Sequence, residues 1–165
     1  MIKIPEIKFE LLIDHARIDE FAAVAWLAQG EGSGLAPTPK FLAEIKRYID
    51  NANSPDPKIT RASGLAFVLT DEDKIIGTIL ADEDRHFDNA AQLNDLAVVP
   101  EYRGRFLGRK LLRHAFVAVK KYSDYEYVVG STVLSGAYYE ALKIPHVGTL
   151  EIDGCKRRFY GAKID

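Results

Sequence analysis

The 165 residues of the chain suit one domain of ordinary size, and 47% of them are hydrophobic, which is enough for a substantial core. Acidic residues outnumber basic ones by 24 to 22, so the net charge of −2 argues against general affinity for the nucleic-acid backbone. The single cysteine, Cys155, excludes an internal disulfide and a Cys-x-x-Cys metal site. Because no apolar stretch has the length of a membrane span and residues 1–6 lack the apolar core of a signal peptide, we expect a cytoplasmic protein that binds neither nucleic acid nor membrane.

The first half of the chain is predicted to contain a strand, two helices and a β-hairpin. Apolar and charged residues alternate after residue 6, as in a half-buried strand, and Asp14 is a candidate N-cap for the helix that follows. Three glycines in residues 30–34 predict a loop, and Thr38-Pro39 has the pattern of an N-cap followed by a first-turn proline. The predicted elements are strands at 7–13, 64–69 and 74–81, the last two joined by a short acidic turn, and helices at 18–26 and 39–49.

The second half alternates between strands and helices and ends in another hairpin. A strand at 90–99 stops at Pro100, which donates no ladder hydrogen bond. Apolar residues at helical spacing from Leu107 to Val119 then predict an amphipathic helix. The remaining elements are strands at 125–130, 147–152 and 157–164 and a short helix at 135–142. This order predicts a mixed α/β fold with a mixed sheet, in a single domain that covers residues 1–165.

Residues 103–109, with the sequence RGRFLGR, join the strand at 90–99 to the helix and carry the strongest chemical signal. Glycines let the backbone approach a ligand closely, and the free amides at a helix N-terminus attract anions. Five cations within residues 103–113 oppose the helix dipole, so a negative partner would offset them. One interpretation is a cradle for a diphosphate. The other is a strand-to-helix connection whose arginines are only solvated.

Residues 98–112, with the sequence VVPEYRGRFLGRKLL, resemble motif A of the GNAT superfamily, the acyl-coenzyme-A-dependent N-acetyltransferases. Phe106 stands where the family pattern has its middle glycine, so either the turn keeps its shape around a bulky residue or the loop runs differently. The resemblance implies a mostly antiparallel sheet of about seven strands in the order β-α-α-β-β-β-α-β-α-β-β. It also implies that the fourth and fifth strands splay apart and that coenzyme A lies in the gap.

Residues 136–142, with the sequence GAYYEAL, resemble the family's late helix. By this resemblance Tyr139 matches a tyrosine that protonates the departing coenzyme A thiolate in many members, a step for which a phenol is a suitable acid. The alternative is a core tyrosine on a helix face beside Tyr138. Ser131 or Ser135 stands near the place of a family asparagine.

The resemblance further implies which residues contact coenzyme A. Backbone amides of about 105–109 would bind its diphosphate. The strand backbone at Leu96, Ala97 and Val98 would pair with its pantetheine arm and polarise the thioester carbonyl. The predicted contacts are Leu96, Ala97, Val98, Arg103, Gly104, Arg105, Phe106, Leu107, Gly108, Arg109, Ser131 and Tyr138.

Several residues are candidates for the catalytic role of removing the proton from the amine. Gln92 stands where many family members carry a glutamate; it takes no proton itself, but it can order a water molecule that does. Asn94 shares a strand face with Gln92 and Leu96 if side chains alternate, which turns Asp95 to the other face. Attack by an already neutral amine, with bulk water taking the proton, is also open. Further candidates are Glu31, Asp82, Glu83 and His86.

Together these features predict a GNAT-like N-acetyltransferase that moves the acetyl group of acetyl-coenzyme A to a primary amine of a small molecule or peptide, by direct attack in a ternary complex. No metal is expected, because no histidine has a partner at metal-ligand spacing. Acidic residues within 82–88 would favour a cationic acceptor if they line its site, and otherwise form a solvated turn. The alternatives are a non-catalytic acyl-coenzyme-A-binding regulatory module and a nucleotide-binding α/β domain. The resemblance leaves a homodimer open.

Overall fold

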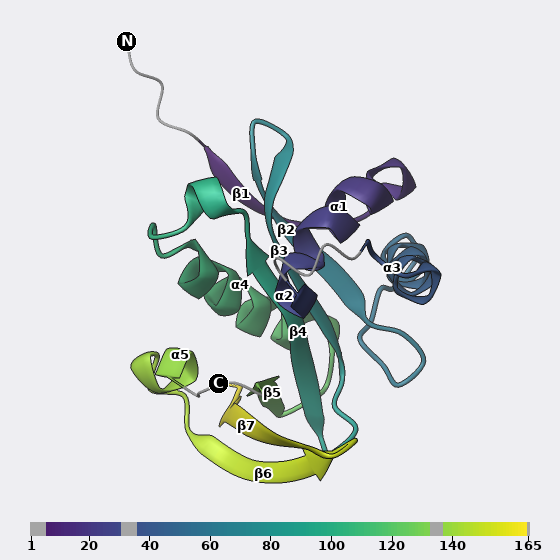
Figure 1. Ribbon diagram of the computed structural model, residues 1–165. Helices are drawn as coiled ribbons and strands as arrows, with labels where there is room; N and C mark the ends of the chain where they lie inside the picture. Colours follow the sequence, from purple (N-terminus) through teal and green to yellow (C-terminus); the bar gives the residue numbers. More distant parts are fainter. Residues whose placement is uncertain (1–5, 31–35, 133–136, 165) are drawn as a thin grey trace.

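The computed structural model describes residues 6–30, 36–132 and 137–164. They form one seven-stranded sheet with helices on both faces (Figure 1). The strands are β1 (Ile7–Leu11), β2 (Leu65–Asp71), β3 (Lys74–Glu83), β4 (Ala90–Val98), β5 (Tyr127–Thr132), β6 (His146–Ile152) and β7 (Cys155–Lys163). The helices are α1 (Ile18–Ala25), α2 (Leu27–Gly30), α3 (Pro39–Ala52), α4 (Leu107–Tyr122) and α5 (Ala137–Ala141), with short 3₁₀ turns at His15–Arg17 and Pro100–Tyr102.

The strands lie in the order β1-β2-β3-β4-β5-β7-β6. In the described part of the chain β4 and β5 form the one parallel pair, and all other neighbouring strands are antiparallel. A parallel pair needs a crossover connection, and α4 supplies it. The expectation of a mixed, mostly antiparallel sheet of about seven strands is therefore confirmed.

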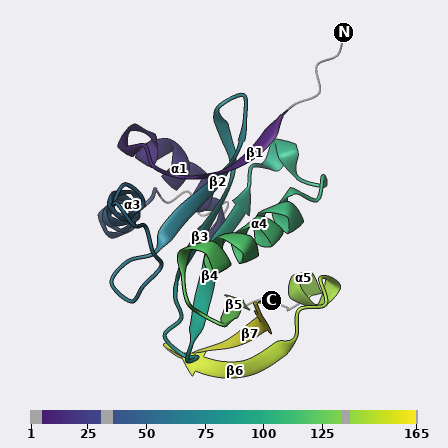
Figure 2. The same ribbon diagram turned by 180° about the vertical axis from the view of Figure 1, so that it is seen from behind.

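Helices α1 and α3 cover one face of the sheet and α4 covers the other, as the opposite views in Figures 1 and 2 show. Each helix turns an apolar stripe toward the strands: Ile45 and Ile49 of α3 and Leu111 and Val119 of α4 are fully buried. Burying one such side chain contributes about 1.5–3 kcal/mol. Because β2 is covered on both faces, it is apolar along nearly its whole length instead of alternating.

The two predicted hairpin turns are confirmed. Glu72 and Asp73 between β2 and β3, and Asp153 and Gly154 between β6 and β7, all have positive φ. Two consecutive residues with positive φ are typical of the tight turns whose twist matches that of a hairpin. Asp and Gly tolerate this conformation better than most residues.

Most predicted elements shift by only a few residues. The first strand ends at Leu11 instead of residue 13, the fifth strand begins at Tyr127, and the additional short helix α2 follows α1. The predicted start of the late helix at Ser135 lies outside the described residues, which resume with Ala137 at the beginning of α5.

Helix α3 begins as the sequence predicts. Thr38 is its N-cap, Pro39 follows in the first turn, and Thr38 Oγ1 accepts a hydrogen bond from the Phe41 amide at 3.1 Å. This cap fixes the start of the helix whose later residues reach the site described below.

Replacing Thr38 by alanine removes the acceptor for the Phe41 amide. We expect Thr38→Ala to lower the free energy of unfolding by about 1 kcal/mol, measured by urea denaturation. Thr38→Ser keeps the hydroxyl and should stay within about 0.5 kcal/mol of the wild type. An equal loss in both variants would contradict the capping role.

Candidate active site

Strands β4 and β5 pair over a short distance and then separate. Their ladder contains four residue pairs and ends at Leu93 and Gly130. Beyond that point Ser131 and Thr132 pair only with β7, while β4 continues along β3 to Val98. The predicted separation of the fourth and fifth strands is present. It leaves one edge of β4, from Asn94 to Val98, without a neighbouring strand among the described residues.

A β-bulge in β4 lies where the separation begins. Asn94 is opposite Leu80 and Ala97 is opposite Thr78, so β4 has one more residue than β3 between these pairs. Asp95 has a φ of 51°, and such a bulge bends a strand and increases its twist. The regular alternation expected for this strand is therefore interrupted after Asn94, and Asp95 lines the same cavity as Asn94 and Leu96.

A cavity of about 680 Å³ fills the space between the two strands. We call it the central cavity. The helices of one face, the ends of β4 and β5, and α5 contribute to its wall. Its lining residues are Ala28, Phe41, Glu44, Leu80, Leu93, Asn94, Asp95, Leu96, Ser131, Thr132, Tyr138, Tyr139 and Arg157.

Tyr139 lies on the α5 side of this cavity, at the level where the strands separate. A Cβ added to Gly130 would lie 2.7 Å from the Tyr139 hydroxyl, so Gly130 gives the phenol the space to reach the end of the β4–β5 ladder. The ring stacks on Tyr160 at a centroid distance of 4.9 Å. Burial raises the pKa of Tyr139, with Tyr138 acting in the same direction, so Tyr139 keeps its proton at neutral pH.

The turn before α4 contains two residues with positive φ. Phe106 is the N-cap of α4 with a φ of 59°, in the left-handed region, and its side chain is 79% exposed. Gly104 also has a positive φ. Phe106 therefore holds a left-handed backbone conformation of the kind that favours glycine, and its ring lies in solvent.

The amides at the start of α4 are available to a ligand. The Lys110 amide donates to the Phe106 carbonyl at 3.1 Å, and this is the first hydrogen bond of the helix. The amides of Leu107, Gly108 and Arg109 precede it, so no carbonyl of the helix accepts from them. A hollow of about 440 Å³ lies at this turn. The predicted contacts that line it are Val98, Arg103, Gly104, Phe106, Leu107, Gly108, Arg109 and Tyr138.

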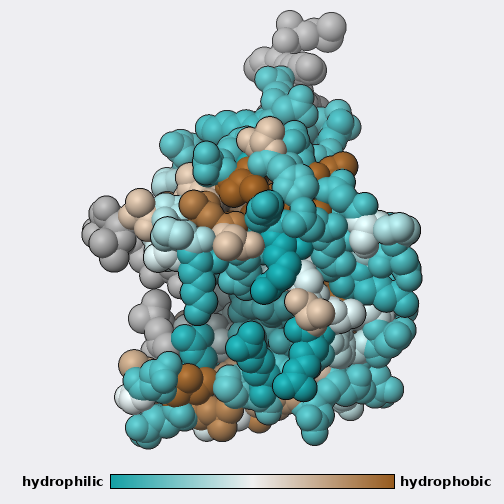
Figure 3. Space-filling model, turned by 90° about the vertical axis from the view of Figure 1, so that its right-hand side faces the viewer, coloured by the Kyte–Doolittle hydropathy of each residue, from teal (hydrophilic) through white to brown (hydrophobic). Residues whose placement is uncertain are grey.

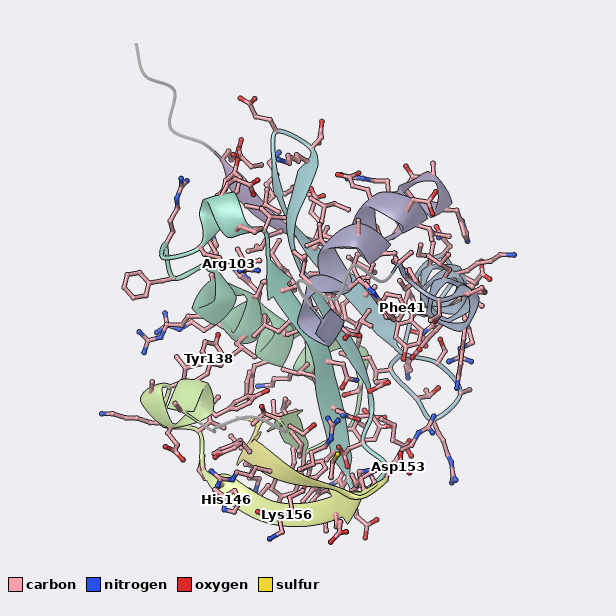
Figure 4. The ribbon with its side chains drawn as sticks, in the orientation of Figure 1. Phe41, Arg103, Tyr138, His146, Asp153 and Lys156 are labelled. Atoms are coloured by element: carbon pink, nitrogen blue, oxygen red, sulfur yellow. The ribbon has the colours of Figure 1, made fainter. Side chains whose placement is uncertain are left out.

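Tyr138 connects this hollow to the central cavity, because it lines both. Figure 4 shows it between α5 and α4. A Cβ added to Gly108 would lie 3.0 Å from the Tyr138 hydroxyl, so this residue reaches the first turn of α4. Burial raises the pKa of Tyr138, and the charge of Arg109 acts against that rise.

The predicted cationic and strand residues have distinct positions. The Arg103 Nε donates to the Val98 carbonyl at 2.9 Å, which ties the turn to the end of β4. The Arg105 guanidinium lies over the Tyr102 ring, 5.0 Å from its centroid. Ala97 is buried in the ladder with β3.

On β5, Ser131 accepts a hydrogen bond from the Arg157 guanidinium at 3.1 Å, and both residues line the central cavity. Ser131 thus lies across the gap from Leu96. Of the other candidates, His86 is exposed in the turn after β3, and Glu31 lies outside the described residues.

The structure separates the two residues predicted to assist the amine. Asn94 lines the central cavity and donates through Nδ2 to Asp82 Oδ1 at 3.0 Å. Gln92 is opposite Asp82 in the β3–β4 ladder, is half-buried, and is not among the residues lining the central cavity.

Sequence reasoning missed two residues beside Asp82. Tyr48 of α3 donates toward Asp82 Oδ2 at 2.9 Å and toward Glu44 Oε1 at 3.0 Å. Burial raises the pKa of Asp82 to about 6, and hydrogen bonds from Tyr48 and Asn94 act against this rise. Tyr48 belongs to the apolar stripe of α3, and only its contact with a strand 34 residues away reveals a polar role.

A second cavity, of about 600 Å³, lies on the other side of Glu44, Tyr48 and Asp82, which line it together with residues of the β3–β4 turn. We call it the acidic cavity. Figure 3 looks onto the side of the molecule that carries α3, where the surface is mostly hydrophilic. Asp84, in this cavity's wall, is 4% exposed, and its Oδ1 accepts hydrogen bonds from the His86 and Phe87 amides.

This geometry belongs to a known class of protein. Residues 62–143 match the family model for an acetyltransferase (GNAT) domain, and the matched segment contains the strand separation, the turn before α4 and Tyr139. The fold and this match define an acyltransferase. The chain belongs to the GNAT family of acetyltransferases.

Solved structures with this fold cover nearly the whole chain. The ribosomal-protein-S18-alanine N-acetyltransferase from Escherichia coli has a TM-score of 0.65 and 18% identity, over 96% of this chain and 94% of that one. An N-acetyltransferase from Staphylococcus aureus Mu50 has a TM-score of 0.71 and 14% identity, over 97% and 99%. A protein from Salmonella typhimurium described as an acetyltransferase, solved with its cofactor acetyl-CoA, has a TM-score of 0.69 and 14% identity, over 96% and 94%. These similarities establish the fold, and no curated protein sequence matches the chain.

Two further properties concern the described residues only. None of their helices is both long enough and apolar enough to cross a membrane. No cluster of three or more His, Cys, Asp or Glu side chains is arranged to hold a metal ion within them.

The conformation of Phe106 leads to a stability prediction. A non-glycine residue in the left-handed region costs about 1–2 kcal/mol, and this exposed ring recovers little by burial. We expect Phe106→Gly to raise the free energy of unfolding by up to about 1 kcal/mol in urea denaturation, because part of the gain is offset by the greater freedom of glycine in the unfolded chain. Phe106→Ala removes the ring but keeps the Cβ, so it should be nearly neutral. A loss of stability in Phe106→Gly would contradict this account.

Proposed function

We propose that the protein transfers the acetyl group of acetyl-coenzyme A to a primary amine of a small molecule or peptide, by direct attack in a ternary complex. The observation that carries the proposal is a cavity at the β4–β5 separation that holds the Tyr139 phenol and reaches the start of α4 through Tyr138. The similar Salmonella typhimurium protein binds acetyl-CoA, which supports the choice of acyl donor.

The start of α4 is suited to the diphosphate of coenzyme A. Amides of residues 107–109 precede the first helical hydrogen bond, and a helix N-terminus attracts anions. Arg109 adds positive charge in the same hollow. Gly104, with its φ of 77°, lets the backbone turn there without strain.

The edge of β4 beyond its last pair with β5 is suited to an extended, amide-containing arm. An extended ligand can add to a strand edge through main-chain hydrogen bonds, and within the described residues no strand pairs with residues 94–98 on the β5 side. In our proposal this edge orients the pantetheine arm, and a backbone amide within residues 96–98 that faces away from β3 polarises the thioester carbonyl, as an oxyanion hole does.

In the reaction we propose, Tyr139 donates its proton to the sulfur that leaves. Its raised pKa keeps the phenol protonated until the thiolate forms, and general acid catalysis of this kind typically contributes about 100-fold to 10,000-fold. Gly130 and the stacked Tyr160 ring hold the phenol at this place. The acetyl-coenzyme A itself supplies an activated acyl group.

Replacing Tyr139 by phenylalanine removes the acid and preserves the ring that stacks on Tyr160. We expect Tyr139→Phe to lower kcat by about 100-fold in a thiol-release assay against a panel of primary amines. Its affinity for coenzyme A, measured by calorimetry, should remain that of the wild type.

The matched control is Tyr127→Phe, which removes an exposed phenol at the opposite end of β5 and should leave turnover unchanged. Wild-type protein that binds coenzyme A but turns over no amine would instead indicate the non-catalytic acyl-coenzyme-A-binding module. Stabilisation of the fold by ATP or NAD but not by coenzyme A would indicate a nucleotide-binding domain.

A further inference from the structure

Three side chains, Glu44, Tyr48 and Asp82, are connected by hydrogen bonds between the two cavities. Tyr48 is in the middle and is 2% exposed. We propose that these residues form a proton relay that removes the proton from the acceptor's ammonium group, in place of the strand glutamate that this chain lacks at Gln92. This inference rests on the proposed acetyl transfer and names the base for that same site.

The relay has a place for one additional proton. The Tyr48 oxygen is 3.0 Å from Glu44 Oε1 and 2.9 Å from Asp82 Oδ2, but a phenol has one proton to donate. Burial raises the pKa of Tyr48 above its ordinary value, so it does not ionise. Both contacts are hydrogen bonds only when one of the two carboxyl groups is protonated.

The positions of the residues give the relay a direction. Glu44 and Asn94 line the central cavity, whereas Asp82 lies behind both of them: it accepts from Asn94 directly and is joined to Glu44 through Tyr48. An ammonium group in the central cavity can therefore contact the Glu44 carboxylate. Asp82 is half-buried, and this partial burial disfavours its charged form.

Burial, together with the surrounding charges, sets the pKa of Asp82. Its pKa is raised to about 6, first by burial and then by the charge of Glu44, while Tyr48, Asn94 and Arg85 act in the lowering direction. Its ladder partner on β4, Gln92, is neutral. The remaining charged residues that line the acidic cavity are Arg47, Arg61, Glu83, Asp84 and Asp88.

The proton balance of the step is complete. Glu44 takes one proton from the ammonium group, and Tyr48 and Asp82 share it along the relay. The neutral amine then forms the C–N bond as the C–S bond breaks, and Tyr139 protonates the sulfur. The second proton lost from nitrogen restores Tyr139 through solvent, and the proton held by the relay is released to water when the products leave.

The first test is the pH profile of Asp82→Asn. With the best acceptor from the amine panel, wild-type kcat/KM should rise as the pH passes through about 6, because the relay accepts a proton only once Asp82 is ionised. Asp82→Asn should lose this rise and lower kcat by about 100-fold. Its KM for acetyl-coenzyme A and its coenzyme A affinity by calorimetry should not change, which also shows that the variant is folded.

The second test breaks the relay without changing either carboxyl group. Tyr48→Phe should lower kcat by about 10-fold or more. It should also change the rise of kcat/KM at about pH 6 that is expected for the wild type. Its matched control is Tyr125→Phe, which removes a phenol bonded to Glu83, the neighbour of Asp82, at 2.5 Å. Tyr125→Phe should keep the wild-type turnover and pH profile.

The outcomes separate this inference from the proposed function. If the wild type acetylates an amine and Asp82→Asn does so equally well with the same pH profile, the relay is wrong and the acetyltransferase proposal stands. If wild-type protein acetylates no amine although it binds coenzyme A, the proposed function fails and the relay fails with it. Loss of turnover in Tyr125→Phe as large as in Tyr48→Phe would also contradict the relay.

Discussion

The β-bulge at Asp95 is the feature on which the rest of the site depends. It lies two residues after Leu93, which forms the last β4–β5 pair with Gly130, and a bulge of this kind bends a strand. The Thr78 hydroxyl donates to the Asp95 carbonyl at 3.1 Å, so the adjacent strand holds the bulge in place. The edge of β4 without a neighbouring strand and the central cavity both begin at this point.

The bulge also decides which side chains meet. Because the extra residue interrupts alternation, Asn94, Asp95 and Leu96 all line one cavity, although alternate residues of a regular strand face opposite sides of the sheet. Asn94 remains in register with Leu80, which keeps its amide within 3.0 Å of Asp82. One backbone irregularity therefore opens the space between the strands and connects it to the polar side chains of β3 and α3.

The sequence predicts the parts of the site that are built from consecutive residues. Residues 103–109 carry the whole turn before α4, so the strand, the glycines and the helix start can be recognised together, and the order of elements follows from periodicity and turn residues. The backbone conformation of Phe106 was not predictable, because a left-handed φ leaves no signal in the hydropathy pattern. The bulge has the same property: Asp tolerates the left-handed region, and nothing in the alternation of 90–99 marks residue 95.

The position of Glu44, Tyr48 and Asp82 could not be predicted for a different reason. Tyr48 fits the apolar stripe of α3 and Asp82 precedes an acidic turn, so each has an ordinary local explanation. Their contact spans 34 residues and exists only because α3 packs on the face of the sheet to which Asp82 points. Hydropathy patterns indicate which face of an element is buried. They do not indicate which polar side chains of two packed elements form hydrogen bonds with each other.

Tyr139 combines both situations. The short motif around it is recognisable in the sequence, but its position in the site depends on contacts with residues distant in the chain. Helix α5 has five residues, and an isolated helix of that length is not stable in water. The phenol is held instead by the stacked ring of Tyr160 on β7 and by the absence of a side chain at Gly130 on β5. The Tyr160 hydroxyl, which donates to Glu140 at 3.3 Å, adds a further link between β7 and α5. The packing of β5 and β7 therefore positions the acid of our proposal. The resemblance in residues 136–142 identifies the phenol, but only this packing brings it to the place where β4 and β5 separate.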